Sequence, residues 1–148
     1  MRIREAHHED AKTIVDFQIR LAFETEGLQL THDTVQKGVA AVFDDSTKGY
    51  YLVAEENGLI AACLLVVPEW SDWRNSTVLW IHSLYVVAEH RHVGVFRAMY
   101  QHLRNKVENR RGYAGIRLYV DQRNTVAIKT YENMGMSNEH YAMFEWMP

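Results

Sequence analysis

One stretch decides the fold of this chain: Ile81–Tyr100, which reads IHSLYVVAEHRHVGVFRAMY. Its first residues belong to a run rich in Val, Leu, Trp and Tyr, which predicts a strand over Thr77–Val87. Its last residues change to a helical period. Apolar side chains then step by three and four, so a helix is expected from about Val93 to Arg110. The inward face of that helix is expected to carry Phe96, Met99, Leu103 and Val107.

The turn between this strand and this helix has the composition of a phosphate-binding loop. A helix N-terminus leaves about four backbone N–H groups unpaired and carries roughly half a positive charge. Gly94 has no Cβ, so an anion can approach the backbone closely. Arg91, His90 and His92 add side-chain donors. These features together favour a pyrophosphate cradle.

Outward from this stretch, the chain alternates between strand and helix patterns. Asn57-Gly58 between two apolar runs predicts a β-hairpin. Strands are expected at Arg2–Glu5, Tyr50–Glu55, Leu59–Val67, Thr77–Val87, Ile116–Val120 and Tyr141–Trp146. The other helices are expected at Asp10–Glu26, from Thr31 to about Phe43, and at Thr125–Asn133. The order mixes a meander with helical crossovers, so the class is α+β (mixed α/β).

Composition indicates one globular domain over residues 1–148. The chain is 47% hydrophobic and 24% charged, which is typical of a soluble protein. The longest apolar run, Leu59–Pro68, is about half of what a bilayer requires. Met1–Glu5 has no apolar leader, and a cytoplasmic protein without membrane contacts is expected. Cys63, the one cysteine, lies in an apolar run and is interpreted as a small buried hydrophobe.

Charge is distributed unevenly along the chain. Residues 1–89 hold 7 Lys/Arg against 14 Asp/Glu, whereas residues 90–123 hold 8 against 2. A basic block inside an acidic chain favours a local anionic ligand. An extended nucleic-acid face is not expected, because such domains are usually basic overall. For any single arginine of the block, solvation of a helix is the simpler interpretation.

Two motifs in this order resemble the GNAT family of N-acetyltransferases. Ile81–Val86 followed by Arg91-x-x-Gly94 resembles the family's motif A, Arg/Gln-x-x-Gly-x-Gly/Ala. Asn124-x-x-Ala127-x-x-x-Tyr131-x-x-x-Gly135-Met136 resembles its motif B. Phe96 departs from the pattern, since the family usually has Gly or Ala there. We interpret Phe96 as pointing inward with the apolar stripe of its helix.

The resemblance implies an acyl-CoA N-acyltransferase fold, with a mixed, mostly antiparallel sheet of about six strands flanked by four helices. It implies acetyl-CoA as the cofactor. Backbone groups after a splay in the motif A strand would hold the pantetheine arm and the acetyl carbonyl, and the loop would wrap the pyrophosphate. The implied cofactor contacts are Leu84, Tyr85, Val86, Arg91, His92, Val93, Gly94, Val95, Phe96, Asn124, Ala127 and Tyr131.

The implied reaction is direct transfer of an acetyl group to a primary amine. Tyr131 is expected as the general acid, because a phenol with a pKa near 10 suits protonation of a departing thiolate. His82 is one candidate base, since a neutral imidazole has a suitable pKa. Glu24, Glu26 and Asp72 are alternatives that would face the amine.

The acceptor itself is open at this stage, as a small amine or a protein amine. Trp70 and Trp73 flank Asp72 in a polar loop, which suits a substrate wall or a subunit interface. The aromatic segment Tyr141–Trp146 would pair or pack across a possible homodimer. No ligand set for a metal is completed by the eight histidines. The alternative function is a non-catalytic acyl-CoA-binding sensor or partner-binding module on the same fold.

Overall fold

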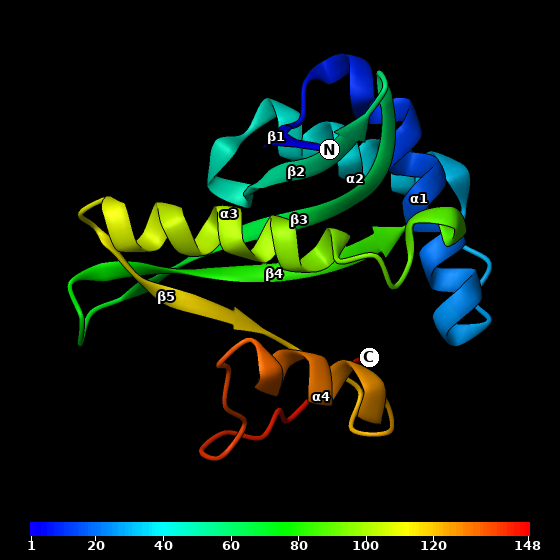
Figure 1. Ribbon diagram of the computed structural model, residues 1–148. Helices are drawn as coiled ribbons and strands as arrows, with labels where there is room; N and C mark the ends of the chain where they lie inside the picture. The colour runs from blue at the N-terminus through cyan, green and yellow to red at the C-terminus, as the bar shows by residue number, and fades with distance from the viewer. The chain divides into compact units, whose positions relative to one another are not determined.

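A five-stranded sheet in the order β1-β2-β3-β4-β5 forms the framework of residues 1–118 (Figure 1). β1 to β4 pair antiparallel, and β4 pairs with β5 in parallel. A parallel pair needs a crossover connection, which the helix between β4 and β5 supplies. The strands are β1 (Arg2–Glu5), β2 (Tyr50–Glu56), β3 (Leu59–Ser71), β4 (Ser76–Val86) and β5 (Tyr113–Leu118).

The computed structural model describes all 148 residues, in two compact units, Met1–Leu118 and Tyr119–Pro148. The single domain expected over residues 1–148 stays a prediction. The first unit holds α1 (Ala11–Glu26), α2 (His32–Asp44) and α3 (Val95–Asn109). The second holds α4 (Thr125–Asn133). The α+β class, the mixed, mostly antiparallel sheet and the four α-helices are confirmed.

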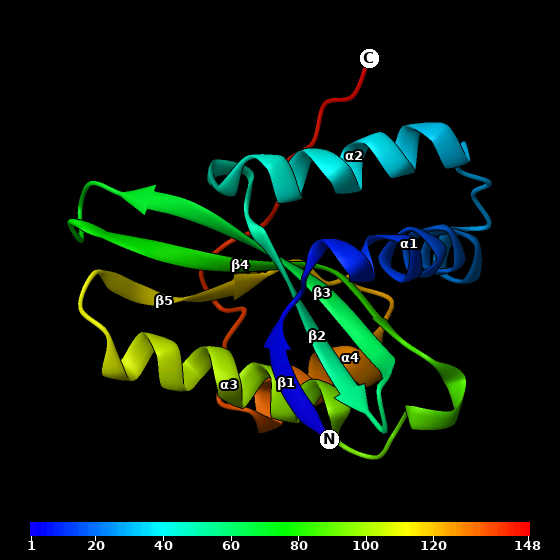
Figure 2. The same cartoon turned by 90° about the horizontal axis from the view of Figure 1, so that it is seen from above.

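Helices cover both faces of the sheet in the first unit: α1 and α2 lie on one face and α3 on the other (Figure 2). Strand side chains alternate between the two faces. Val53 and Cys63 pack with Ile14 and Phe17 of α1, and all four are buried. Cys63 is fully buried as expected, and burial raises the pKa of its thiol to about 12.

The hairpin predicted at Asn57-Gly58 is confirmed. Asn57 and Gly58 both have positive φ, 53° and 77°, the conformation that a two-residue turn between twisted strands requires. The pairing of Glu56 with Leu59 closes the turn. The turn sets the register of Glu55 and Glu56 on β3, and a bulge between Ala54 and Glu55 shifts the register for the rest of the pair.

The expected closing strand at Tyr141–Trp146 is wrong, so the sheet has five strands rather than about six. Residues 141–148 form no helix or strand. A strand needs a neighbouring strand to pair with. If one face of a strand is covered, every second side chain along it is buried. Here Tyr141, Phe144 and Trp146 are 81%, 97% and 84% exposed. Side chains at both odd and even positions are therefore exposed, unlike those of a strand with one covered face.

Two smaller expectations change as well. β5 begins at Tyr113 rather than Ile116, because its pairing with β4 starts at Thr77. Phe96 does not occupy the inward stripe of α3. Val95 and Met99 are buried there, while Phe96 is half-buried at the margin, with its ring 6.4 Å from that of Tyr100.

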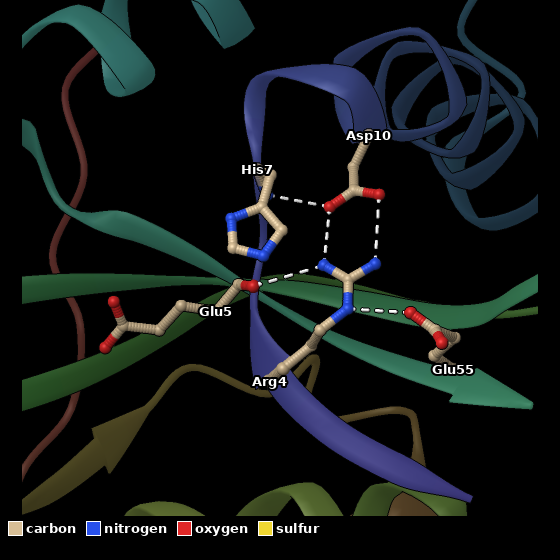
Figure 3. A network of polar contacts seen from close by, with 5 residues as sticks. All are labelled: Arg4, Glu5, His7, Asp10 and Glu55. Carbon is tan, nitrogen blue, oxygen red and sulfur yellow. Dashed lines mark hydrogen bonds and ion pairs between the residues drawn. The ribbon is translucent and has the colours of Figure 1, made fainter. Parts of the chain in front are cut away.

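A buried ion-pair network fastens the first strand to the start of α1 (Figure 3). Arg4 donates from both terminal nitrogens to the carboxylate of Asp10, at 2.7 and 3.2 Å, and from Nε to Glu55 at 2.7 Å. The backbone N–H of His7 also donates to Asp10, at 2.7 Å. The hydrogen bonds from Arg4, followed by that from His7, lower the pKa of Asp10.

We expect Asp10→Ala to lower the free energy of unfolding by about 2–3 kcal/mol at pH 7. The substitution leaves the Arg4 guanidinium with Glu55 and the backbone carbonyl of Glu5 as its remaining partners. The folded-state pKa of Asp10 is depressed, so its contribution is complete above the unfolded value near 4 and fades as pH falls through the folded value. Urea unfolding at pH 7 and pH 3 measures both effects.

The matched control is Asp33→Ala, which removes an exposed ion pair with Lys37 on α2. The two variants should differ clearly at pH 7, and the difference should narrow as the pH falls below about 4. Equal losses at pH 7 would show that the Arg4 network does not stabilise the fold.

Candidate functional site

A β-bulge interrupts β4 in the middle of the motif stretch Ile81–Val86. Tyr85 pairs with Cys63 and His82 pairs with Leu65, so Ser83 and Leu84 together lie opposite Leu64. Ser83 has a positive φ of 52°, which is uncommon for a residue with a Cβ. A bulge bends its strand and redirects the residues that follow. Its position therefore governs where the end of β4 presents its backbone.

Beyond the bulge, β4 has no strand on its second edge within the 1–118 unit. Its pairing with β5 ends at Ile81 opposite Leu118, while β4 continues to Val86. Val87 donates its N–H to Ala61 of β3. Since successive residues of a strand turn their backbone groups to opposite edges, Val86 and Leu84 face away from β3. Within the 1–118 unit, the end of β4 is therefore unpaired on this edge, as a splay would require.

The loop after β4 ends in a row of backbone N–H groups at the start of α3. His92 and Gly94 have positive φ, 64° and 87°. Ala98 donates to the carbonyl of Gly94, whereas the N–H groups of residues 95–97 precede the first helical acceptor. A Cβ built on Gly94 would meet nothing within 4 Å, so the space before the helix is open. The arrangement suits a phosphate or pyrophosphate.

Arg91 is held by the acidic end of α1. Its Nη2 donates to Glu24 at 2.6 Å and its Nε donates to the carbonyl of Val86 at 2.8 Å. The guanidinium carbon lies 5.5 Å from the ring centre of Tyr85, whose hydroxyl donates to Glu24 at 2.9 Å. The loop is thereby tied to both α1 and β4.

This contact changes the interpretation of Glu24. The hydrogen bond from Arg91, followed by that from Tyr85, lowers the pKa of the Glu24 carboxyl. A carboxylate held in this way is a poor proton acceptor near neutral pH. Sequence reasoning placed Glu24 at the acceptor and Arg91 at the pyrophosphate, and it missed their pairing, because no local spacing connects residues 67 positions apart.

A second tie anchors the loop to the β2–β3 turn. His90 lies 2.8 Å from Glu56 through Nε2, while its Nδ1 is buried without a partner. The loop is thus fixed on two sides, and its N–H row needs little ordering before it meets a ligand.

His82 lies immediately before the bulge and is half-buried. Its ring is stacked on that of Trp80, with 6.2 Å between the ring centres. Burial lowers the pKa of the imidazole, so His82 is neutral at pH 7. A neutral imidazole can accept a proton, which keeps His82 as a candidate base.

A cavity of about 400 Å³ lies between α1 and the bulge. Glu26, predicted at the acceptor, and Leu84, predicted at the cofactor, both line it. Sequence reasoning missed most of its wall, since the α1 positions carry ordinary helix residues. The other lining residues are Gln18, Leu21, Ala22, Thr25, Leu30 and Ser83.

Trp70, Asp72 and Trp73 do not join this group. They lie at the far end of the β3–β4 hairpin, where Trp70 pairs with Thr77, six residues before Ser83 along β4. At about 3.3 Å per residue, this separates them from the bulge by roughly 20 Å. Trp70 and Trp73 are 63% and 89% exposed. A substrate wall at the bulge is therefore not built from them.

The motif B residues lie in the second unit. Asn124 caps α4, its side-chain oxygen accepting from the N–H of Ala127 at 3.0 Å. Tyr131 lies on the same helix, and burial raises the pKa of its phenol. Their contacts to a cofactor stay predictions, as do those of the motif A residues.

No three His, Cys, Asp or Glu side chains gather closely enough to hold a metal ion. None of the helices combines the length and the apolar composition that crossing a membrane requires.

Comparison with known proteins shows the family to which the chain belongs. The sequence model of the acetyltransferase (GNAT) family matches residues 16–136. A possible acetyltransferase from Clostridium difficile 630 is 39% identical, with a TM-score of 0.92, and the match covers 99% of this chain and 97% of that one. A search of curated proteins gives no significant match.

More distant structures share the fold alone. A probable acetyltransferase is 19% identical with a TM-score of 0.86, covering 100% of this chain and 97% of that one. Ribosomal-protein-alanine N-acetyltransferase from Brucella melitensis biovar Abortus 2308 is 16% identical, with a TM-score of 0.80 and 99% coverage of both chains. At such identities, neither structure indicates which acceptor this chain uses.

We expect Glu24→Gln to loosen the loop of residues 88–94. Without a carboxylate, Arg91 keeps its bond to Val86 but loses its ion pair. Amide hydrogen exchange in residues 88–97 should quicken by at least about threefold, because local opening becomes easier. Glu108→Gln, which removes an exposed ion pair with Arg104 on α3, is the control and should leave these amides unchanged. Unaltered exchange in Glu24→Gln would mean that the contact does not order the loop.

Proposed function

The chain belongs to the GNAT family of acetyltransferases, and we propose that it transfers an acetyl group from acetyl-CoA to a primary amine of a small molecule or protein. The observation that carries the proposal is the open edge of β4 beyond Ile81, next to the N–H row that begins α3. One element offers hydrogen bonds to an extended amide-bearing arm, and the other offers them to a pyrophosphate. The pantetheine arm and the pyrophosphate of acetyl-CoA would therefore each have a complementary surface.

This geometry indicates which residues would bind acetyl-CoA. The backbone groups of Leu84 and Val86 would bind the pantetheine arm, and the N–H groups of residues 92–97 would bind the pyrophosphate. Gly94 leaves room for close approach. Arg91 would support the loop through Glu24 rather than supply a free guanidinium. Bound acetyl-CoA supplies the thioester whose carbonyl the amine attacks.

We assign the role of base to His82, which lies one residue before the cavity-lining Ser83, and we assign Glu26 to binding the amine. Glu24 is occupied by Arg91 and Tyr85, and Asp72 lies at the opposite end of the hairpin. In the proposed reaction a C–N bond forms and the C–S bond breaks. His82 takes the proton that the amine loses, and Tyr131 gives a proton to the thiolate. The raised pKa of Tyr131 keeps its phenol protonated at neutral pH until the thiolate forms.

Release of free thiol from acetyl-CoA in the presence of an amine panel tests the activity. Release that depends on both protein and amine supports the transferase. Binding of coenzyme A without turnover on any amine or peptide would instead support the non-catalytic sensor. Tyr131→Phe should lower kcat at least about tenfold with little change in affinity for coenzyme A.

Tyr141→Phe is the matched control for that variant, because it removes a hydroxyl from another tyrosine of the 119–148 unit, one that is 81% exposed. It should retain full turnover. A Tyr131→Phe enzyme that turns over as fast as the wild type would remove Tyr131 from the acid role.

We also propose a homodimer, supported by the exposed aromatic side chains of two segments. Trp70 and Trp73 lie on the β3–β4 hairpin, and Phe144 and Trp146 lie near the C-terminus. Aromatic side chains are enriched at protein interfaces, so each of the two segments is a candidate contact. Light scattering coupled to gel filtration should give twice the monomer mass, and a Phe144→Ser, Trp146→Ser variant should shift toward monomer. A monomeric wild type at micromolar concentration would refute the dimer.

A further inference from the structure

The cavity beside the β4 bulge has a wall chemistry that restricts the acceptor. Its apolar wall is formed by Leu21, Ala22, Leu30 and Leu84. These residues come from α1, from the segment that follows it and from β4, so an apolar group inserted between them is contacted from several sides. At about 400 Å³, the cavity is at the lower end of the range for small-molecule pockets.

Glu26 is the only charged residue that lines this cavity. It makes no hydrogen bond or ion pair with the rest of the chain, so its carboxylate is free for a ligand. Glu24, two residues earlier, is fully engaged by Arg91 and Tyr85. One carboxylate balances one ammonium group, whereas a polyamine would bring further charges without partners into an apolar cavity.

No lysine or arginine lines the cavity. Arg91 is the basic side chain of the adjoining loop, and its guanidinium is committed to Glu24 and the carbonyl of Val86. A phosphate or carboxylate on the acceptor would find no cation in the cavity wall, because Arg20 of α1 lies at Glu24 and Tyr85 instead. Its charge would also lie near Glu26, which repels it.

We propose that the acceptor is a small monocationic amine with an apolar body: Glu26 binds the ammonium group, and Leu21, Leu30 and Leu84 contact the body. The bound ammonium group gives one proton to solvent before the neutral nitrogen attacks the thioester, and the second proton passes to His82 as the C–N bond forms. The inference rests on the proposed acetyltransferase activity, which it sharpens by naming the substrate class. Leu84 borders the cavity and also lies at the β4 edge proposed for the donor, so amine and thioester would meet at this residue. Phosphorylated amino sugars and polyamines are disfavoured as substrates.

The test compares three amines with the full chain and acetyl-CoA, by thiol release: 2-phenylethylamine, spermidine and glucosamine 6-phosphate. We expect kcat/KM for 2-phenylethylamine to exceed both others by at least about tenfold, the factor that corresponds to roughly 1.4 kcal/mol. Higher kcat/KM for spermidine or for glucosamine 6-phosphate would overturn the substrate class while upholding the transferase. Absence of thiol release with every amine would refute the transferase itself, and this inference with it.

Two variants test whether the cavity residues bind the amine. Glu26→Gln should raise KM for 2-phenylethylamine about tenfold and leave KM for acetyl-CoA unchanged, because it removes the charge that holds the ammonium group. Leu30→Trp should do the same by filling the cavity. Glu9→Gln, an exposed change at the other end of the helical segment, should alter neither constant. Unchanged KM for the amine in Glu26→Gln would overturn the assignment.

Discussion

The whole site depends on one constraint: β4 must pair with β3 along its length but with β5 only as far as Ile81. Unpaired backbone groups in the middle of a protein are costly, so a strand that leaves them open needs something to satisfy them. The bulge at Ser83 concentrates this openness at the end of the strand, directly before the loop and α3. A β5 longer by four residues would close the edge and leave no place for an extended ligand.

Most basic side chains of residues 90–123 form ion pairs with acidic residues. The basic block of residues 90–123 suggests a strong positive field, yet most of its side chains are engaged locally. Arg91 pairs with Glu24, Arg104 with Glu108, Arg117 with Glu69 and Arg123 with Asp121. A phosphate approaching α3 therefore meets oriented backbone dipoles first. Such dipoles are fixed by the fold and need no side-chain ordering, which suits a ligand that binds and leaves in every cycle.

Local patterns predicted the features that depend on local physics. Asn57-Gly58 specified its turn, and the apolar spacing of α3 specified a helix within two residues of its observed ends. The misses are non-local. The Glu24–Arg91 pair joins distant segments, the register of β5 depends on β4, and Tyr141–Trp146 has strand-forming residues but no strand beside it. Phe96 was misplaced by one position, because Val95 satisfies the same helical period.

Burial shifts the pKa values of the two proposed proton-transfer residues in opposite directions. Removing solvent disfavours the charged form, so it lowers the pKa of His82 and raises that of Tyr131. The same physical effect therefore yields a neutral base and a neutral acid at the same pH. Neither requires an ionic partner, whereas the acidic alternative Glu24 has been committed to holding Arg91. In the proposed reaction, charge recognition is thus left to Glu26, which binds the amine, while His82 and Tyr131 exchange protons as groups that are neutral beforehand.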